Sequence, residues 1–279
     1  MSPASGSVEE SPLAVTVPRP VMNDGAGEPL VLLIAGDGKH MDGYAFLLPL
    51  LERKHRVVTV SLLEGWTGIG VQLPSIDELV GRARAAILDL GPGRSIALIG
   101  FSLAGVVAAA YTASYAGVGR LIVISASLTS SPRHRAFART WARARALGSD
   151  GMRDFVTYSM LSPAFHEDSR PSDNAAIDAL MIDPTADAAA AIFAAADISN
   201  LAPQIDVPTL VIGCAGDQVA SVEQSQALFA AIPSARYSEI DCGHAALLER
   251  PVEVLSLLER FLRNPHRHAP ASVIPRDEP

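Results

Sequence analysis

Short, continuous apolar runs alternate along the chain with longer segments in which apolar residues recur at helical spacing. Such runs are typical of strands buried on both faces of a parallel sheet, and their alternation with helices predicts an α/β fold. The expected strands span residues 30–34, 56–60, 96–99, 121–124, 208–213 and 235–240. The expected helices span residues 41–53, 76–90, 103–115, 222–231 and 252–262.

The regular alternation stops at residue 128 and resumes after residue 200. The sequence between them is helix-like, rich in alanine and without a convincing strand. Because a structureless loop of such length is unusual, we interpret residues 128–200 as a helical cap that is inserted into the core and shapes the substrate pocket. The α/β core is then expected to comprise residues 28–127 and 201–263.

The two ends of the sequence have compositions that disfavour a packed core. Residues 1–27 begin with a Ser-, Pro- and Glu-rich stretch, which predicts a flexible arm in which residues 13–17 could form a short edge strand. Residues 264–279 contain histidines and prolines and predict a disordered tail.

Composition and charge narrow the class of protein. A chain of 279 residues, 49% of them hydrophobic, can bury one large core. The net charge of −8 and the lack of a long Lys/Arg run argue against nucleic acid or an anionic membrane as a partner. The two cysteines are too few for a disulfide framework, and the first residues lack the features of a signal peptide. We therefore expect a cytoplasmic protein that acts on a small molecule, with its oligomeric state left open.

One serine occupies a tight turn between an expected strand and an expected helix. Residues 100–104 read Gly-Phe-Ser-Leu-Ala, which is the nucleophile elbow pattern G-x-S-x-G with Ala104 in place of the second glycine. Such a turn strains the backbone of Ser102 so that its Oγ points outward. The strand and the helix nearly touch there, and Gly100 and Ala104 are small enough to allow it.

An acid and a histidine follow the serine in the order Ser, Asp, His, each after an expected strand. A serine hydroxyl needs a base to accept its proton, and that base must be oriented by an acceptor on its other nitrogen. Ser102, His244 and Asp217 are the candidates for nucleophile, base and orienting acid. Three nearby acidic residues remain alternatives to Asp217: Asp206, Glu239 and Asp241.

The elbow and the order of the three residues resemble the α/β-hydrolase fold family, and the resemblance covers residues 28–263. Residues 31–36 resemble the family's oxyanion strand, and residues 243–251 resemble its histidine loop and last helix. The resemblance implies a mostly parallel sheet flanked by helices, and an oxyanion hole made by the backbone amides of Leu103 and Asp37. Many relatives carry histidine and glycine where this chain has Ala35 and Gly36, and the acid Asp37 at the donor position is a departure from the pattern.

Three residues near the elbow or the oxyanion loop are candidates for the pocket: Gly36, His40 and Phe101. Trp66 is a fourth candidate, because it follows the expected strand at residues 56–60. No metal site is expected. No G-x-G-x-x-G or P-loop pattern follows a strand, so no nucleotide cofactor is expected either.

Three functions are consistent with these patterns. The leading hypothesis is a serine hydrolase that forms an acyl-enzyme on Ser102 and acts on an ester, a lactone or a thioester. The second is a lyase, cyclase or cofactor-free oxygenation enzyme with His244 as base, which the carboxylate of Asp37 beside the oxyanion hole keeps open. The third is a small-molecule binding protein that retains the fold.

Overall fold

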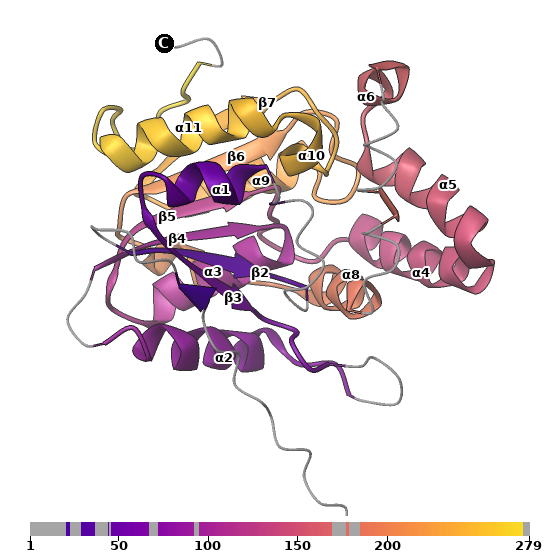
Figure 1. The fold of residues 1–279 in the computed structure, drawn as a ribbon, viewed down its shortest axis with the longest axis horizontal. Helices are drawn as coiled ribbons and strands as arrows, with labels where there is room; N and C mark the ends of the chain where they lie inside the picture. Colours follow the sequence, from indigo (N-terminus) through magenta and orange to yellow (C-terminus); the bar gives the residue numbers. More distant parts are fainter. Residues whose placement is uncertain are drawn as a thin grey trace, which may run out of the picture.

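The strands form one seven-stranded sheet in the order β1-β3-β2-β4-β5-β6-β7 (Figure 1). Strand β1 pairs antiparallel with β3, and all other neighbours pair in parallel. The bounds are β1 Val21–Met22, β2 Pro29–Ile34, β3 Arg56–Ser61, β4 Ile96–Phe101, β5 Val118–Ile124, β6 Thr209–Cys214 and β7 Ala235–Ile240. The α/β architecture and every strand expected from the apolar runs between residues 30 and 240 are confirmed.

The structure is a computed structural model. The residues it describes are 21–22, 29–36, 44, 46–66, 72–91, 95–168, 177–178 and 185–275. The edge strand expected at residues 13–17 lies outside the described residues, as does the rest of the expected arm up to residue 20.

Helices cover both faces of the sheet (Figure 1). Helices α1 (Leu47–Glu52) and α11 (Pro251–Arg263) pack on one face, and α2 (Ile76–Leu88), α3 (Leu103–Ser114) and α9 (Val222–Ala231) pack on the other. The expected helices therefore form. Within the described part of the chain, the first of these helices, α1, begins later than its apolar pattern predicts.

Side chains of the central strands point alternately into two separate clusters. In β2, Val31 and Leu33 face the cluster that includes α2 and α3, whereas Leu30, Leu32 and Ile34 face the cluster that includes α1 and α11. A strand with both faces buried needs apolar residues at every position, because successive side chains point to opposite faces. The burial of both strand faces therefore explains the continuous apolar runs of the sequence.

The start of α2 shows how local sequence sets an element boundary. Ser75 Oγ accepts a hydrogen bond from the backbone N–H of Glu78 at 3.2 Å, and the Glu78 carboxylate accepts one from the backbone N–H of Ser75 at 2.7 Å. This capping box satisfies N–H groups that have no partner inside the helix.

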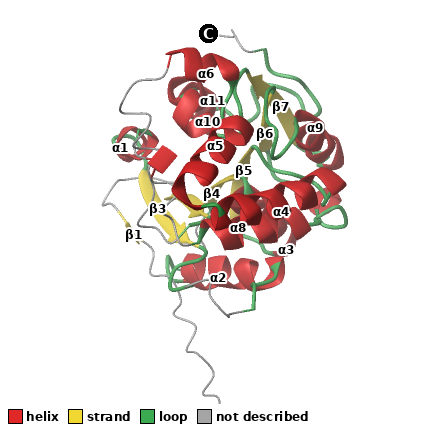
Figure 2. Cartoon of the chain, turned by 90° about the vertical axis from the view of Figure 1, so that its right-hand side faces the viewer, coloured by secondary structure: helices red, strands yellow, loops and turns green. Residues whose placement is uncertain are grey.

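The chain leaves the sheet between β5 and β6 and forms helices there. The described ones are α4 (Pro132–Ala146), α5 (Gly148–Met160), α6 (Pro163–Asp168) and α8 (Ala186–Ala195), here named the inserted helices. They lie together at one end of the sheet (Figures 1 and 2). Asp187 of α8 joins α8 to α4, because its carboxylate accepts hydrogen bonds from Trp141 Nε1 at 2.7 Å and from Arg145 Nε at 2.9 Å. No strand occurs among the described residues of this segment.

The segment after α11 differs from its sequence prediction over the described residues 264–275. Disorder is expected for residues 264–279, but residues 271–274 run parallel to β7. Ala271 N–H donates to Ala235 O at 2.7 Å, and Ile274 N–H donates to Tyr237 O at 2.7 Å. Ile274 is buried against the α11 side of the sheet. Residue composition does not predict this pairing, because the segment bonds to backbone groups of β7 and every residue type carries such groups.

The turn from β4 into α3 brings two backbones into contact. Ser102 has φ = 54°, in a region that residues other than glycine rarely adopt. A Cβ on Gly100 would lie 2.2 Å from the carbonyl oxygen of Ala104, and one on Gly105 would lie 3.0 Å from Gly100 O. Strand and helix can therefore cross at this distance only with glycine at residue 100.

Gly100→Ala should lower the free energy of unfolding by about 2 kcal/mol or more, because overpacking typically costs about 1–3 kcal/mol and here the added methyl meets rigid backbone. Gly81 of α2 provides the matched control, since a Cβ there would meet nothing within 4 Å. Gly81→Ala should stabilise the protein by about 0.5–1 kcal/mol, the usual gain at a helix interior. Chemical denaturation measures both. A Gly100→Ala protein as stable as the wild type would contradict the close approach.

Candidate active site

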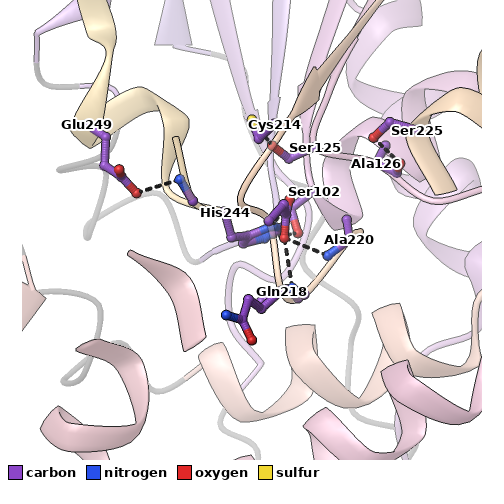
Figure 3. A network of polar contacts seen from close by, with 12 residues as sticks. Ser102, Ser125, Ala126, Cys214, Gln218, Ala220, Ser225, His244 and Glu249 are labelled. Atoms are coloured by element: carbon purple, nitrogen blue, oxygen red, sulfur yellow. Dashed lines mark hydrogen bonds and ion pairs between the residues drawn. The ribbon is translucent and has the colours of Figure 1, made fainter. Parts of the chain in front are cut away.

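Ser102, His244 and Asp217 form one hydrogen-bonded chain at the carboxyl end of the sheet. Ser102 Oγ lies 3.0 Å from His244 Nε2, and His244 Nδ1 lies 2.8 Å from Asp217 Oδ2. Figure 3 shows the Ser102 side chain beside that of His244. Ser102 follows β4, Asp217 follows β6 and His244 follows β7, so loops far apart in the sequence meet here.

The hydrogen-bond partners of His244 determine which of its two ring nitrogens carries the hydrogen. An ionised carboxylate only accepts hydrogen bonds, so Nδ1–H donates to Asp217 and the lone pair of Nε2 faces the Ser102 hydroxyl. Nε2 can then accept the serine proton as the oxygen attacks a carbonyl carbon. The arrangement is therefore able to activate Ser102 as a nucleophile.

The turn after β6 holds the Asp217 carboxylate in place. Its Oδ1 accepts hydrogen bonds from the backbone N–H groups of Val219 at 2.7 Å and Ala220 at 2.8 Å, and the bond to Ala220 is visible in Figure 3. Asp217 is 6% exposed and His244 is 2% exposed. These bonds leave Oδ2 free to accept from His244, so the carboxylate is rigid and shielded from water.

Of the acidic candidates from the sequence, Asp217 is the one placed at the histidine. His244 Nδ1 carries a single hydrogen, and it donates that hydrogen in a hydrogen bond to Asp217. The carboxylate of Glu239 instead accepts from the Tyr237 hydroxyl at 3.0 Å.

Aromatic rings surround the His244 imidazole. The Phe101 ring lies 5.1 Å from it and the Phe193 ring of α8 lies 6.3 Å from it, centroid to centroid. A second buried histidine, His134 of α4, lies 5.3 Å from the Phe193 ring. Burial lowers the pKa of His134, although the charge of Asp217 acts in the opposite direction. The lowered pKa favours the neutral form of His134, which carries no positive charge.

A cavity of about 180 Å³ opens over Ser102, between the sheet and the inserted helices. Its described lining contains no Asp, Glu, Lys or Arg. The inserted helices contribute mostly aromatic and small apolar side chains to it, among them Phe137, Trp141, Met160, Ala189, Ala190 and Phe193. The cavity therefore favours an uncharged, apolar group next to the reactive oxygen.

The residues predicted for the pocket have different outcomes. Gly36, Phe101 and Leu103 line the cavity. Trp66 is not among the described lining residues. Its side chain is half-buried and packs against the core cluster that includes α2 and α3. Two other expected residues, Asp37 and His40, lie outside the described residues.

Leu103 is placed as an oxyanion donor would be. It is the first residue of α3, so its backbone N–H has no acceptor one turn earlier in the helix, and the positive end of the helix dipole lies beside Ser102. A negative oxygen that develops next to Ser102 would meet that N–H.

A model of the alpha/beta hydrolase family matches residues 31–257, which is more than half of the chain. The chain belongs to the alpha/beta hydrolase family. The pyrrolizixenacetamide deacetylase of Xenorhabdus hominickii is similar to this alpha/beta hydrolase, with 26% identity over 250 residues that cover 86% of this chain and 92% of that protein.

Solved structures share the fold of this alpha/beta hydrolase. The enol-lactonase from Burkholderia xenovorans superposes with a TM-score of 0.74 at 23% identity, covering 88% of this chain and 95% of that one. A thermophilic esterase from Thermogutta terrifontis superposes with a TM-score of 0.70 at 22% identity, covering 88% and 94%. At these identities the likeness shows the fold alone.

Several residues of this alpha/beta hydrolase site were not identified from the sequence. Tyr44 lines the cavity, and burial raises its pKa, so its hydroxyl stays neutral. Four residues of α8 line it too: Ala186, Ala189, Ala190 and Phe193. Their spacing of three and four residues is the one signal that could have found them, because it places all four on one helical face. The sequence does not say what that face contacts.

Among the described residues, no cluster of three or more His, Cys, Asp or Glu side chains could hold a metal ion. None of the helices in the described ranges is long and apolar enough to cross a membrane.

The geometry predicts how quickly Ser102 reacts with a fluorophosphonate probe. Asp217→Asn should slow the labelling of Ser102 by about a thousandfold or more, because an amide at this position does not hold His244 in the reactive tautomer. Asp206→Asn, which changes an exposed acid before β6, should label at the wild-type rate. Intact-protein mass spectrometry over time measures both. Equal labelling of the Asp217→Asn and wild-type proteins would show that another group orients His244.

Proposed function

We propose that this alpha/beta hydrolase is a serine hydrolase that cleaves a carboxylic ester, lactone or thioester of a small molecule through an acyl-enzyme on Ser102. The observation that carries the proposal is the hydrogen-bonded chain from Ser102 Oγ through His244 to Asp217, with distances of 3.0 Å and 2.8 Å. The family supports hydrolysis in general, and a relative that the chain covers almost completely is named a deacetylase.

In the proposed reaction the carbonyl carbon of the substrate lies next to Ser102 Oγ. Nε2 of His244 accepts the serine proton while Oγ bonds to the carbon, and the resulting oxyanion accepts a hydrogen bond from Leu103 N–H. The imidazolium then donates the proton to the leaving oxygen or sulfur, which leaves the acyl group on Ser102. Water, deprotonated by Nε2 in the same way, then bonds to the acyl carbon. The bond from that carbon to Ser102 Oγ breaks, the imidazolium returns its proton to Oγ, and the acid is released.

Asp217 keeps the imidazolium stable in both halves of this reaction. Its buried carboxylate lies 2.8 Å from Nδ1, and a charge pair in a water-poor site is much stronger than one in bulk water. The two backbone N–H groups on Oδ1 keep the carboxylate fixed while the charge on the histidine changes.

The cavity supports a substrate with an uncharged apolar group. An engineered apolar cavity of about 150 Å³ holds benzene, so the 180 Å³ found here has room for a group of about that size. A charged group in the same position would be buried without a partner among the described lining residues, which is strongly unfavourable. We propose small apolar esters, such as aryl or short branched acyl esters, as the substrate class.

The two other functions from the sequence receive less support. The non-hydrolytic alternative depends on Asp37, which lies outside the described residues. A binding protein has no need for a buried Ser–His–Asp chain, and it would not be labelled at Ser102.

Ser102→Ala should abolish hydrolysis of phenyl acetate and phenyl benzoate, leaving less than about one thousandth of the wild-type kcat, because no acyl-enzyme can form. Ser114→Ala, at the other end of α3, removes a hydroxyl that donates to Ala110 O and should leave kcat unchanged. Steady-state kinetics on both esters, with circular dichroism to confirm folding, is the measurement. Substantial hydrolysis by the Ser102→Ala protein would exclude the acyl-enzyme.

Ala189→Leu should reduce kcat/KM for phenyl benzoate by about tenfold or more while changing that for phenyl acetate by less than about threefold, since three added carbons take space that a benzoyl ring needs. Ala195→Leu, on the exposed end of the same helix, is the matched control and should leave both esters unaffected. An equal loss on both esters would mean that this face of α8 does not limit the acyl group.

A further inference from the structure

A buried carboxylate behind the catalytic histidine takes no part in the steps above. Glu249, the last residue of α10 (Ala246–Glu249), is 8% exposed. Its Oε1 accepts hydrogen bonds from the backbone N–H groups of Gly243 at 3.0 Å and Ser162 at 3.0 Å, and its Oε2 accepts one from the Ser162 hydroxyl. Figure 3 shows the carboxylate pointing at the nitrogen just before His244. Within the described part of the chain no Lys or Arg pairs with it.

The donors come from two segments that are distant in the sequence. Gly243 directly precedes His244, whereas Ser162 lies between α5 and α6 of the inserted helices. The residue after the histidine is held at the same place, because Ala245 N–H donates to Met160 O at 3.0 Å. On one side of His244, Ala245 therefore bonds directly to Met160 at the end of α5. On the other side, Gly243 is joined to Ser162 through the Glu249 carboxylate.

No side chain fits between these two segments. A Cβ on Gly243 would lie 2.7 Å from the carbonyl oxygen of Met160 and 2.8 Å from Glu249 Oε1. Met160 also lines the cavity over Ser102. The end of α5 thus forms part of the pocket wall and part of the support of the histidine.

We infer that Glu249 is a positioning residue that joins the His244 loop to the inserted helices, so that the pocket wall and His244 Nε2 are placed together. A buried carboxylate without a cation is stable only while its oxygens are hydrogen-bonded, so its three donors must stay where they are. The inference rests on the proposed function, since it assigns Glu249 an effect on the step that His244 performs.

Substitutions at Glu249 separate this role from simple stabilisation. Glu249→Met keeps the length of the side chain but has no oxygen, so the N–H groups of Gly243 and Ser162 lose their acceptor. We expect kcat for phenyl acetate to fall by about tenfold or more with KM changed by less than about threefold, because the histidine is displaced while the small substrate still binds.

Glu249→Gln should restore kcat to within about threefold of the wild type, because its carbonyl oxygen can accept both N–H groups and the Ser162 hydroxyl can accept from its amide. The control is Glu253→Gln, which removes a carboxylate from the first turn of α11 and should leave kcat unchanged. Thermal unfolding of each protein shows that it is folded at the assay temperature. A folded Glu249→Met protein with wild-type kcat would overturn the inference, even if its melting temperature is lower.

A further variant decides the matter if Glu249→Met does not fold. Ser162→Ala removes only the hydroxyl donor and leaves both backbone bonds, so kcat should fall by about threefold to tenfold at unchanged KM. A kcat equal to that of the wild type would then overturn the inference. The Ser102→Ala protein separates the two proposals: if it retains activity, the proposed function fails, whereas an inactive Ser102→Ala with an unaffected Glu249→Met removes only the role of Glu249.

Discussion

The close contact between the backbones of Gly100 and Ala104 is the constraint on which the site depends. It lets β4 connect to α3 without an intervening loop. This tight connection imposes the positive φ of Ser102. The same turn places the free N–H at the start of α3 next to the serine oxygen. The proposed nucleophile and the proposed oxyanion donor are therefore positioned by one local geometry, before any contact with the rest of the site.

The remaining groups reach Ser102 because the sheet is parallel. The loops after β6 and β7 lie at the same carboxyl end of the sheet as the turn after β4, and each carries one polar side chain of the site. Asp217 is held by its own turn, and the His244 loop is bonded to the end of α5. The site is thus built from rigid loops on a buried sheet, which is how preorganised charge stabilisation is obtained.

The sheet and the three polar residues were predictable from the sequence because each leaves a local sign. A strand buried on both faces is continuously apolar, and the elbow needs Gly100 beside Ser102. The pocket wall was not predictable in detail, since the face of α8 that contains Ala189 is apolar whichever partner it meets. Glu249 was missed because two of its three donors are backbone N–H groups, which no residue type reveals, and the third, the Ser162 hydroxyl, is distant in the sequence. The ordered segment after α11 was missed for the same reason.

That segment also covers backbone groups at the end of the sheet. Strand β7 ends the parallel sheet, and its outer edge would offer a row of unpaired N–H and C=O groups to another strand. Residues 271–274 occupy part of that edge, with hydrogen bonds to Ala235 and Tyr237. The same few residues thus satisfy backbone groups that an exposed sheet edge would leave open to pairing with a strand of another molecule.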